Sequence, residues 1–161
     1  MNKYLQRFTL VVAVVATATV LASGAAGAAN GGRPFHVVLS GANEVPSNPH
    51  GDADRGSITL TLNPGQEEVC WSFGAITLTA GEALPTAGHI HEAPADKAGP
   101  PVVTLFGAAP APAPPTSYPT GTTCVTADRA LIIEILQDPS AYYVNLHNAT
   151  HPDGVMRGQL G

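Results

Sequence analysis

The sequence is poor in charged residues, and basic residues are especially scarce. Only 12% of its 161 residues are charged, and only seven are Lys or Arg. A protein that binds nucleic acid through its phosphates needs a patch of basic side chains, so this class is excluded. The net charge of −5 also disfavours binding to anionic membranes.

Cysteine and aromatic residues are few as well, whereas glycine and proline are abundant. Two cysteines are too few for a disulfide-rich scaffold or a four-thiolate zinc site. Seventeen glycines and fifteen prolines suit short strands joined by turns better than a helical bundle. The signatures of serine hydrolases, phosphate-binding loops, zinc-protease helices and dinucleotide-binding folds are missing. We therefore expect a single all-β domain with no recognisable catalytic motif.

The one long apolar run lies at the N-terminus and predicts a secretory signal peptide over residues 1–28. Lys3 and Arg7 precede an uncharged stretch from Phe8 to Leu21, and small residues follow up to Ala28. A basic start, a short apolar stretch and an A-x-A site are typical of a cleaved signal. A membrane anchor is the alternative, which the Ala- and Gly-rich exit disfavours.

Residues 29–161 are the predicted exported domain. Loss of the first 28 residues removes two basic residues and no acidic ones, so the net charge becomes −7. No later segment is long and apolar enough to span a bilayer. We expect this domain to be secreted, periplasmic or on the cell surface, with an extracellular protein or a small ligand as its partner.

Apolar and polar residues alternate along much of this domain and predict about eight short strands. The clearest alternation runs from Phe35 to Gly41 and from Ser57 to Leu62. Antiparallel strands with such alternation, separated by turns, favour a β-sandwich. The expected strands are residues 35–41, 57–62, 68–78, 88–91, 102–106, 122–125, 141–147 and 155–160.

Two segments depart from this alternation. Apolar residues at helical spacing between Ala127 and Leu136 predict one short helix at about 127–137, with Asp128 or Thr126 as its N-cap. The proline-rich stretch from Ala108 to Gly121 is expected to be a surface loop.

The two cysteines, Cys70 and Cys124, each lie in a predicted strand. In an oxidising compartment they are expected to pair, and two buried free thiols are the alternative. Neither has a histidine beside it in sequence, which disfavours a catalytic thiol. A disulfide closing a loop of this length would stabilise the domain by about 4 kcal/mol.

His89 and His91 form the strongest local motif. Residues two apart on a strand share one face, so both imidazoles would point the same way, about 6 to 7 Å apart. His147 lies in a later strand, and if the two strands are neighbours it would complete a three-imidazole site for zinc or copper. Hydrogen-bonded structural histidines are the alternative. Further ligands or hydrogen-bond acceptors could come from Glu92, Asp96, His151 and Asp153.

Glu44 and Arg157 are a second candidate pair. An arginine within an apolar terminal strand needs a carboxylate or a group of carbonyls as its partner. An internal ion pair that holds the last strand is the favoured interpretation. A receptor for an anionic ligand is the alternative.

Three motifs in order resemble the CHRD domain, a family first described in chordin and widespread in secreted bacterial proteins. They are LSGANEVP (Leu39–Pro46), AGHIHEAPADKAGPPVVTL (Ala87–Leu105) and YYVNLHNATHPDGVMRGQL (Tyr142–Leu160). The resemblance covers about residues 35–161. It implies an extracellular β-rich module that serves in binding or structure, with no established reaction and no agreed ligand.

The H-x-H strand is also similar to the copper-binding region of copper/zinc superoxide dismutases. On that resemblance His89 and His91 match the motif, and His147 is a candidate third ligand. The remaining dismutase pattern is missing. This absence disfavours an active dismutase. Binding of copper or zinc through these histidines is the alternative function, with dismutase-like redox chemistry as an extension of it.

Overall fold

The computed structural model describes residues 31–47 and 53–161. The expected signal peptide, residues 1–28, and His50 lie outside these ranges. Between residues 31 and 161, no helix of the described part is long and apolar enough to cross a membrane.

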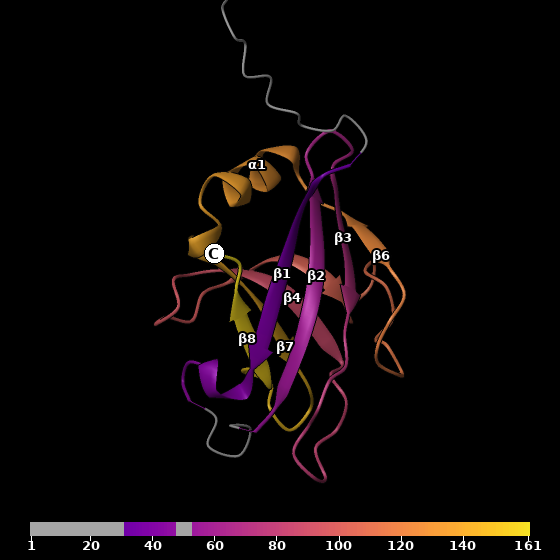
Figure 1. Ribbon diagram of the computed structural model, residues 1–161, viewed down its shortest axis with the longest axis vertical. Helices are drawn as coiled ribbons and strands as arrows, with labels where there is room; N and C mark the ends of the chain where they lie inside the picture. Colours follow the sequence, from indigo (N-terminus) through magenta and orange to yellow (C-terminus); the bar gives the residue numbers. More distant parts are fainter. Residues whose placement is uncertain (1–30, 48–52) are drawn as a thin grey trace, which may run out of the picture.

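Eight strands and one α-helix confirm the all-β prediction (Figure 1). A 3-10 turn follows the first strand and another precedes the seventh. The strands are β1 (Arg33–Ser40), β2 (Arg55–Asn63), β3 (Glu68–Phe73), β4 (Ala87–Glu92), β5 (Pro101–Phe106), β6 (Thr123–Thr126), β7 (Tyr142–His147) and β8 (Met156–Gln159); the helix is α1 (Arg129–Gln137), and the 3-10 turns are η1 (Gly41–Asn43) and η2 (Pro139–Ala141).

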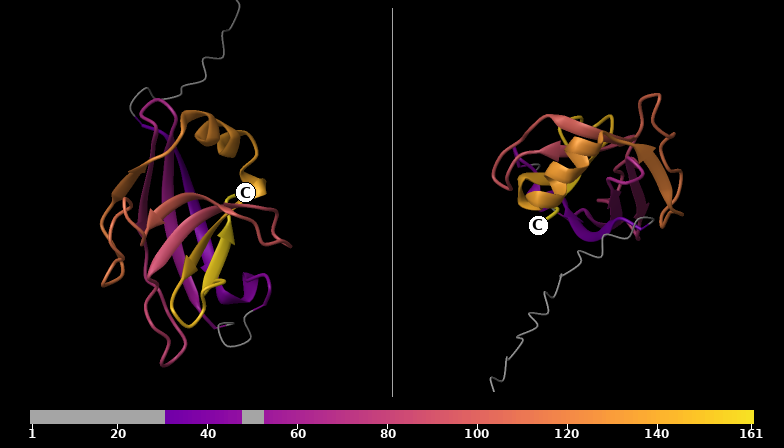
Figure 2. Two further views of the ribbon diagram at one scale, coloured as in Figure 1. Left: turned by 180° about the vertical axis from the view of Figure 1, so that it is seen from behind. Right: turned by 90° about the horizontal axis from the view of Figure 1, so that it is seen from above.

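All eight strands belong to one antiparallel sheet in the order β5-β4-β7-β8-β1-β2-β3-β6. The sheet curls on itself, so that β1 and β2 lie across from β4 and β7, as two of the views show (Figures 1 and 2). The two packed halves correspond to the expected sandwich, but the strands are joined into one nearly closed sheet.

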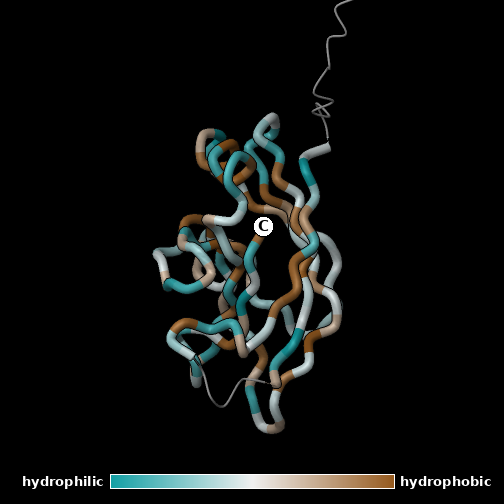
Figure 3. The backbone as a smooth tube through the Cα atoms, turned by 60° about the vertical axis from the view of Figure 1, so that its left-hand side comes forward, coloured by the Kyte–Doolittle hydropathy of each residue, from teal (hydrophilic) through white to brown (hydrophobic). Residues whose placement is uncertain are grey.

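The core lies between these halves and follows the alternation read from the sequence (Figure 3). Leu39, Ile58 and Leu60 are fully buried, and the rings of Trp71 and Phe106 lie 5.6 Å apart between the two halves of the sheet. The helix α1 covers one end of this core with two fully buried isoleucines. Burial of these apolar side chains is the main force that stabilises the domain.

The start of α1 is set by its capping residue. The Asp128 carboxylate accepts hydrogen bonds from the backbone N–H groups of Ala130 and Leu131. An N-cap residue stands just outside the helix, so the helix begins at Arg129, two residues after the expected start.

The predicted disulfide is present. Cys70 on β3 and Cys124 on β6 are directly paired in the antiparallel register, and their sulfurs are bonded. The bond fastens β6, a strand of only four residues at the edge of the sheet, to its one neighbour. The proline-rich segment after β5 is a loop, as expected, and lines an apolar pocket of about 750 Å³ between β5 and β6.

One strand is shorter than predicted. The alternation suggested a strand over 68–78, but β3 ends at Phe73, and residues 74–86 form a loop with a single isolated bridge at Thr77. The pairing with β2 slips by one residue here, because Phe73 is opposite Ile58 but the next bridge joins Thr77 to Arg55. This irregularity ends the regular strand. Beyond it, the buried Asp54 carboxylate accepts through Oδ1 from both the backbone N–H and the hydroxyl of Thr79, at 2.6 and 2.8 Å, and holds the loop beside the start of β2.

Candidate metal centre

Three of the predicted histidines come together on the outer face of the sheet. Strands β4 and β7 are antiparallel neighbours, with His89 opposite Asn145 and His91 opposite Tyr143. This register places His147 on the same face, diagonal to His89. One ligand atom from each of His89, His91 and His147 lies within 4.8 Å of the other two. We call these three residues the histidine cluster.

Hydrogen bonds to two loops define which nitrogens of the cluster carry hydrogen. Nδ1 of His91 lies 2.9 Å from the carbonyl oxygen of Gly99, and Nδ1 of His147 lies 3.0 Å from that of Pro152. Carbonyl oxygens only accept, so each Nδ1 is the donor, and in the neutral ring Nε2 then bears a lone pair. These two Nε2 atoms face each other at 3.3 Å.

The cluster is neutral at ordinary pH because it is withdrawn from water. Burial, together with the smaller effects of His89 and His91, lowers the pKa of His147 to about 4. Burial is also the main cause that lowers the pKa of His89 and of His91. A proton shared between the two facing nitrogens is therefore disfavoured.

The third member offers a nitrogen of a different kind. Nδ1 of His89 is buried and has no hydrogen-bond partner in the described part of the protein. A buried polar atom without a partner destabilises a fold unless something else satisfies it. The imidazole of His89 lies 5.0 Å, centre to centre, from that of His147.

Loops bury this part of the outer face. The loop after β4 reaches the cluster through Gly99, whose N–H donates to the Tyr143 hydroxyl at 3.1 Å. A Cβ at Gly99 would lie 1.9 Å from the Glu92 carbonyl oxygen, so the loop can approach this closely only with glycine there. The ring of Tyr143 stacks on that of His91, with centres 5.0 Å apart and planes 16° apart.

The buried guanidinium of Arg157 lies next to Tyr143 and contacts the same loop. It lies 3.5 Å from the centre of the Tyr143 ring and donates to the carbonyl oxygens of Lys97 and Pro94. Arg157 is only 2% exposed. These bonds hold the loop after β4 over the cluster, so the arginine finds its partners among carbonyls.

Glu44 and Arg157 both line a cavity of about 370 Å³. The two side chains form no direct ion pair in the part of the chain that the structure describes. Glu44 instead accepts from the amide of Asn145 at 3.3 Å. Burial raises the pKa of Glu44 to about 8, against the opposing effects of the Arg157 charge and the Asn145 hydrogen bond. The carboxyl group is therefore mostly protonated at neutral pH.

The other candidate ligands named from the sequence do not join the cluster. Glu92, Asp96 and Asp153 are exposed, and none lies with the three histidines in the group of close ligand atoms. His151 turns to Glu82 instead, at 3.1 Å. Among the described residues the other group close enough to hold a metal contains Cys70 and Cys124, whose disulfide leaves no thiolate to bind one.

Sequence reasoning missed several residues that shape the centre. The carbonyls of Gly99 and Pro152 carry no side-chain signal, and Glu82 is 69 residues before its partner His151 in sequence. Asn145 lies 101 residues after Glu44 in sequence, and nothing near it marks the two as hydrogen-bond partners.

The fold and the cluster define a small all-β domain with a buried three-histidine site. The sequence profile of the CHRD domain matches residues 35–160, and the chain therefore belongs to the CHRD domain family. No curated protein and no solved structure matches it.

Proposed function

We propose that this CHRD domain is an exported binding module that holds a copper or zinc ion through His89, His91 and His147. The proposal depends most on one observation, the 3.3 Å distance between Nε2 of His91 and Nε2 of His147. Two lone pairs that face each other repel unless a positive charge lies between them. The lowered pKa values make a metal ion a better candidate for that charge than a proton.

The distance also fits the geometry of a metal site. Zinc–nitrogen bonds are about 2.0–2.1 Å long, and two such bonds at a tetrahedral angle separate their nitrogens by about 3.3 Å. The hydrogen bonds from each Nδ1 to a carbonyl are the usual way in which proteins orient a metal-binding histidine. Imidazole suits both zinc and copper.

Three protein ligands would leave the fourth position of a tetrahedral ion for water or another small ligand. This arrangement is typical of sites that bind or transform a molecule at the metal, whereas closed structural sites use four protein ligands. The redox alternative requires copper, and superoxide consumption by the copper-loaded protein tests it separately.

Export is supported by the signal-like N-terminal pattern and by the Cys70–Cys124 disulfide, which persists in oxidising compartments.

The test is titration of the purified exported protein with Cu²⁺ and Zn²⁺ while thermal unfolding is followed. A ligand that binds only the folded form stabilises it by about 2.7 kcal/mol at a hundredfold excess over Kd. We expect this shift in the wild type and its loss in His91→Ala and His147→Ala.

A matched control is available in His36, which is exposed on β1 beside Thr59. His36→Ala removes one strand histidine without touching the cluster, so it should keep the full shift. Absence of a shift in the wild type, or an equal loss in His36→Ala, contradicts the proposal.

A further inference from the structure

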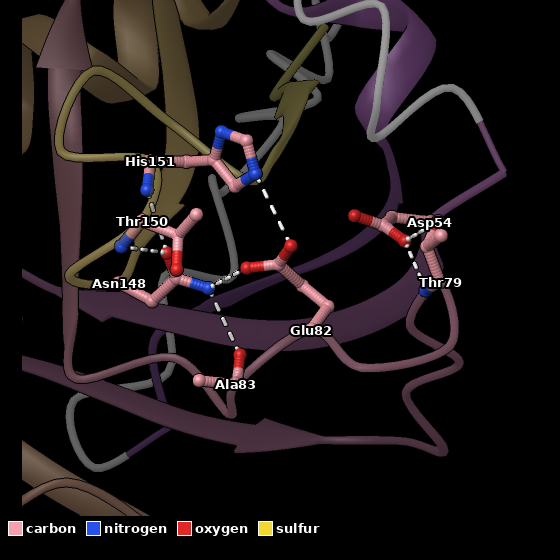
Figure 4. Close-up of polar contacts among 7 residues, drawn as sticks. All are labelled: Asp54, Thr79, Glu82, Ala83, Asn148, Thr150 and His151. Carbon is pink, nitrogen blue, oxygen red and sulfur yellow. Dashed lines mark hydrogen bonds and ion pairs between the residues drawn. The ribbon is translucent and has the colours of Figure 1, made fainter.

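A second polar network lies beside the histidine cluster, between the loop after β3 and the turn formed by residues 148–154 (Figure 4). The Glu82 carboxylate lies at its centre. One oxygen contacts Nε2 of His151 at 3.1 Å, and the other accepts a short hydrogen bond from the side-chain amide of Asn148. The same amide donates to the carbonyl of Ala83 at 2.9 Å.

Asn148 also organises the 148–154 turn from inside. Its Oδ1 accepts from the backbone N–H groups of Thr150 and His151, at 3.0 and 2.8 Å (Figure 4). The carbonyl of His151 then accepts from the N–H of Gly154 at 3.2 Å. Asn148 is only 2% exposed, and every hydrogen-bonding atom of its side chain is used.

This turn carries the carbonyl that orients the metal centre. Pro152, next to His151, accepts the hydrogen bond from Nδ1 of His147. A continuous series of contacts therefore runs from Glu82, through the turn, to Nδ1 of His147, and hydrogen on Nδ1 leaves the lone pair on Nε2.

We propose that Glu82 is a positioning residue for the histidine cluster. It holds the 148–154 turn so that the Pro152 carbonyl keeps hydrogen on Nδ1 of His147 and directs Nε2 toward His91. The consequence for metal binding rests on the function proposed above, whereas the effect on the His147 tautomer does not. His151 then serves to anchor the turn and is not a metal ligand.

The size of the effect follows from how metal sites respond to changes around the ligands. Loss of a partner that orients a ligating histidine typically lowers metal affinity 10- to 100-fold. Glu82 acts one contact further away, through the turn, so we expect Glu82→Leu to weaken binding about tenfold.

Asp54 provides the matched control. Its carboxylate is also buried and holds the same loop, through Thr79, without contacting the 148–154 turn (Figure 4). If metal binding depended only on a well-ordered loop after β3, Asp54→Ala would weaken it as much as Glu82→Leu does.

The experiment has two measurements on each variant. NMR of the imidazole nitrogens in the metal-free protein reports the tautomer of His147, and titration with Zn²⁺ reports affinity. In the wild type we expect the tautomer with hydrogen on Nδ1. Glu82→Leu should show a mixture of tautomers and the tenfold loss, and Asp54→Ala should show neither.

His151→Gln separates anchoring from metal ligation, because glutamine keeps an N–H donor for Glu82 and removes the imidazole. We expect affinity within about twofold of the wild type. A loss as large as that of His147→Ala, or an unchanged His147 tautomer in Glu82→Leu, overturns the proposal. Failure of Zn²⁺ and Cu²⁺ to bind the wild type refutes the metal function alone, and the tautomer measurement still decides the role of Glu82.

Discussion

The outer face of the sheet has two regions that look alike in sequence and differ in structure. On β1 and β2, outward residues such as His36 and Thr59 are exposed, and Val38 is 65% exposed. On β4, β7 and β8 the outward residues include His91 at 7% and Arg157 at 2% exposure. Both regions follow the same alternation of core and outward positions.

The loops cause this difference. The loop after β4 and the 148–154 turn cover the outer face of β4, β7 and β8, which we call the covered face. Among the described residues, no corresponding segment is held by hydrogen bonds over the outer face of β1 and β2. A histidine in water keeps its hydration, whereas a histidine under a loop must find its partners in the protein. An outward strand position thus becomes a candidate site only when a loop covers it.

The first prediction, which has the largest expected effect, is that loss of the disulfide lowers stability without changing metal binding at the covered face. Cys70→Ala/Cys124→Ala removes a link that closes 54 residues of chain, and should lower the free energy of unfolding by about 4 kcal/mol. The disulfide joins β3 to β6, away from the covered face, so metal affinity should not change. Denaturant unfolding and Zn²⁺ titration measure the two effects, and a parallel loss of affinity would show that the two regions are coupled.

The second prediction concerns Glu44, which is buried beside Asn145 and has a raised pKa. The folded protein holds this proton up to about pH 8, and the unfolded chain releases it near pH 4.5, so stability falls as pH rises between these values. Glu44→Gln cannot ionise and should be more stable than the wild type at pH 8.5, by on the order of 3 kcal/mol.

The useful range for this measurement is pH 6.5 to 8.5. Below pH 6.5 the lowered pKa of His147 has the opposite effect, since the unfolded chain takes up the proton first and the metal-free protein loses stability toward pH 4. Glu67→Gln changes an exposed glutamate and is the control. Equal pH profiles for Glu44→Gln and the wild type would refute the buried-carboxyl explanation.

The third and smallest prediction compares two buried tyrosine hydroxyls. Tyr143 accepts a hydrogen bond from the Gly99 N–H on the covering loop, so Tyr143→Phe should lower stability by about 1 kcal/mol. The Tyr118 hydroxyl is buried without a hydrogen-bond partner in the described structure, and Tyr118→Phe should change stability by about zero or raise it slightly. Thermal unfolding measures both, and a larger effect at Tyr118 would contradict the assigned role of the Tyr143 hydroxyl.

Much of the fold could be predicted because its signals are local. Alternation located all eight strands, and Asp128 correctly marked the start of the helix as one of two candidate caps. Strand β3 was predicted too long because its pairing with β2 slips by one residue between Phe73 and Thr77. Register is a property of two paired strands, so alternation along one of them does not show such a slip.

The histidine cluster likewise has one feature that the sequence predicted and several that it did not. Spacing alone determined that His89 and His91 share a face, because successive strand residues point to opposite sides of a sheet. Only the tertiary structure decided that β4 pairs with β7, that loops cover this face, and that backbone carbonyls orient two of the three imidazoles. The physical reason is that side-chain direction is a property of one strand, whereas neighbours, burial and hydrogen-bond partners depend on the whole chain.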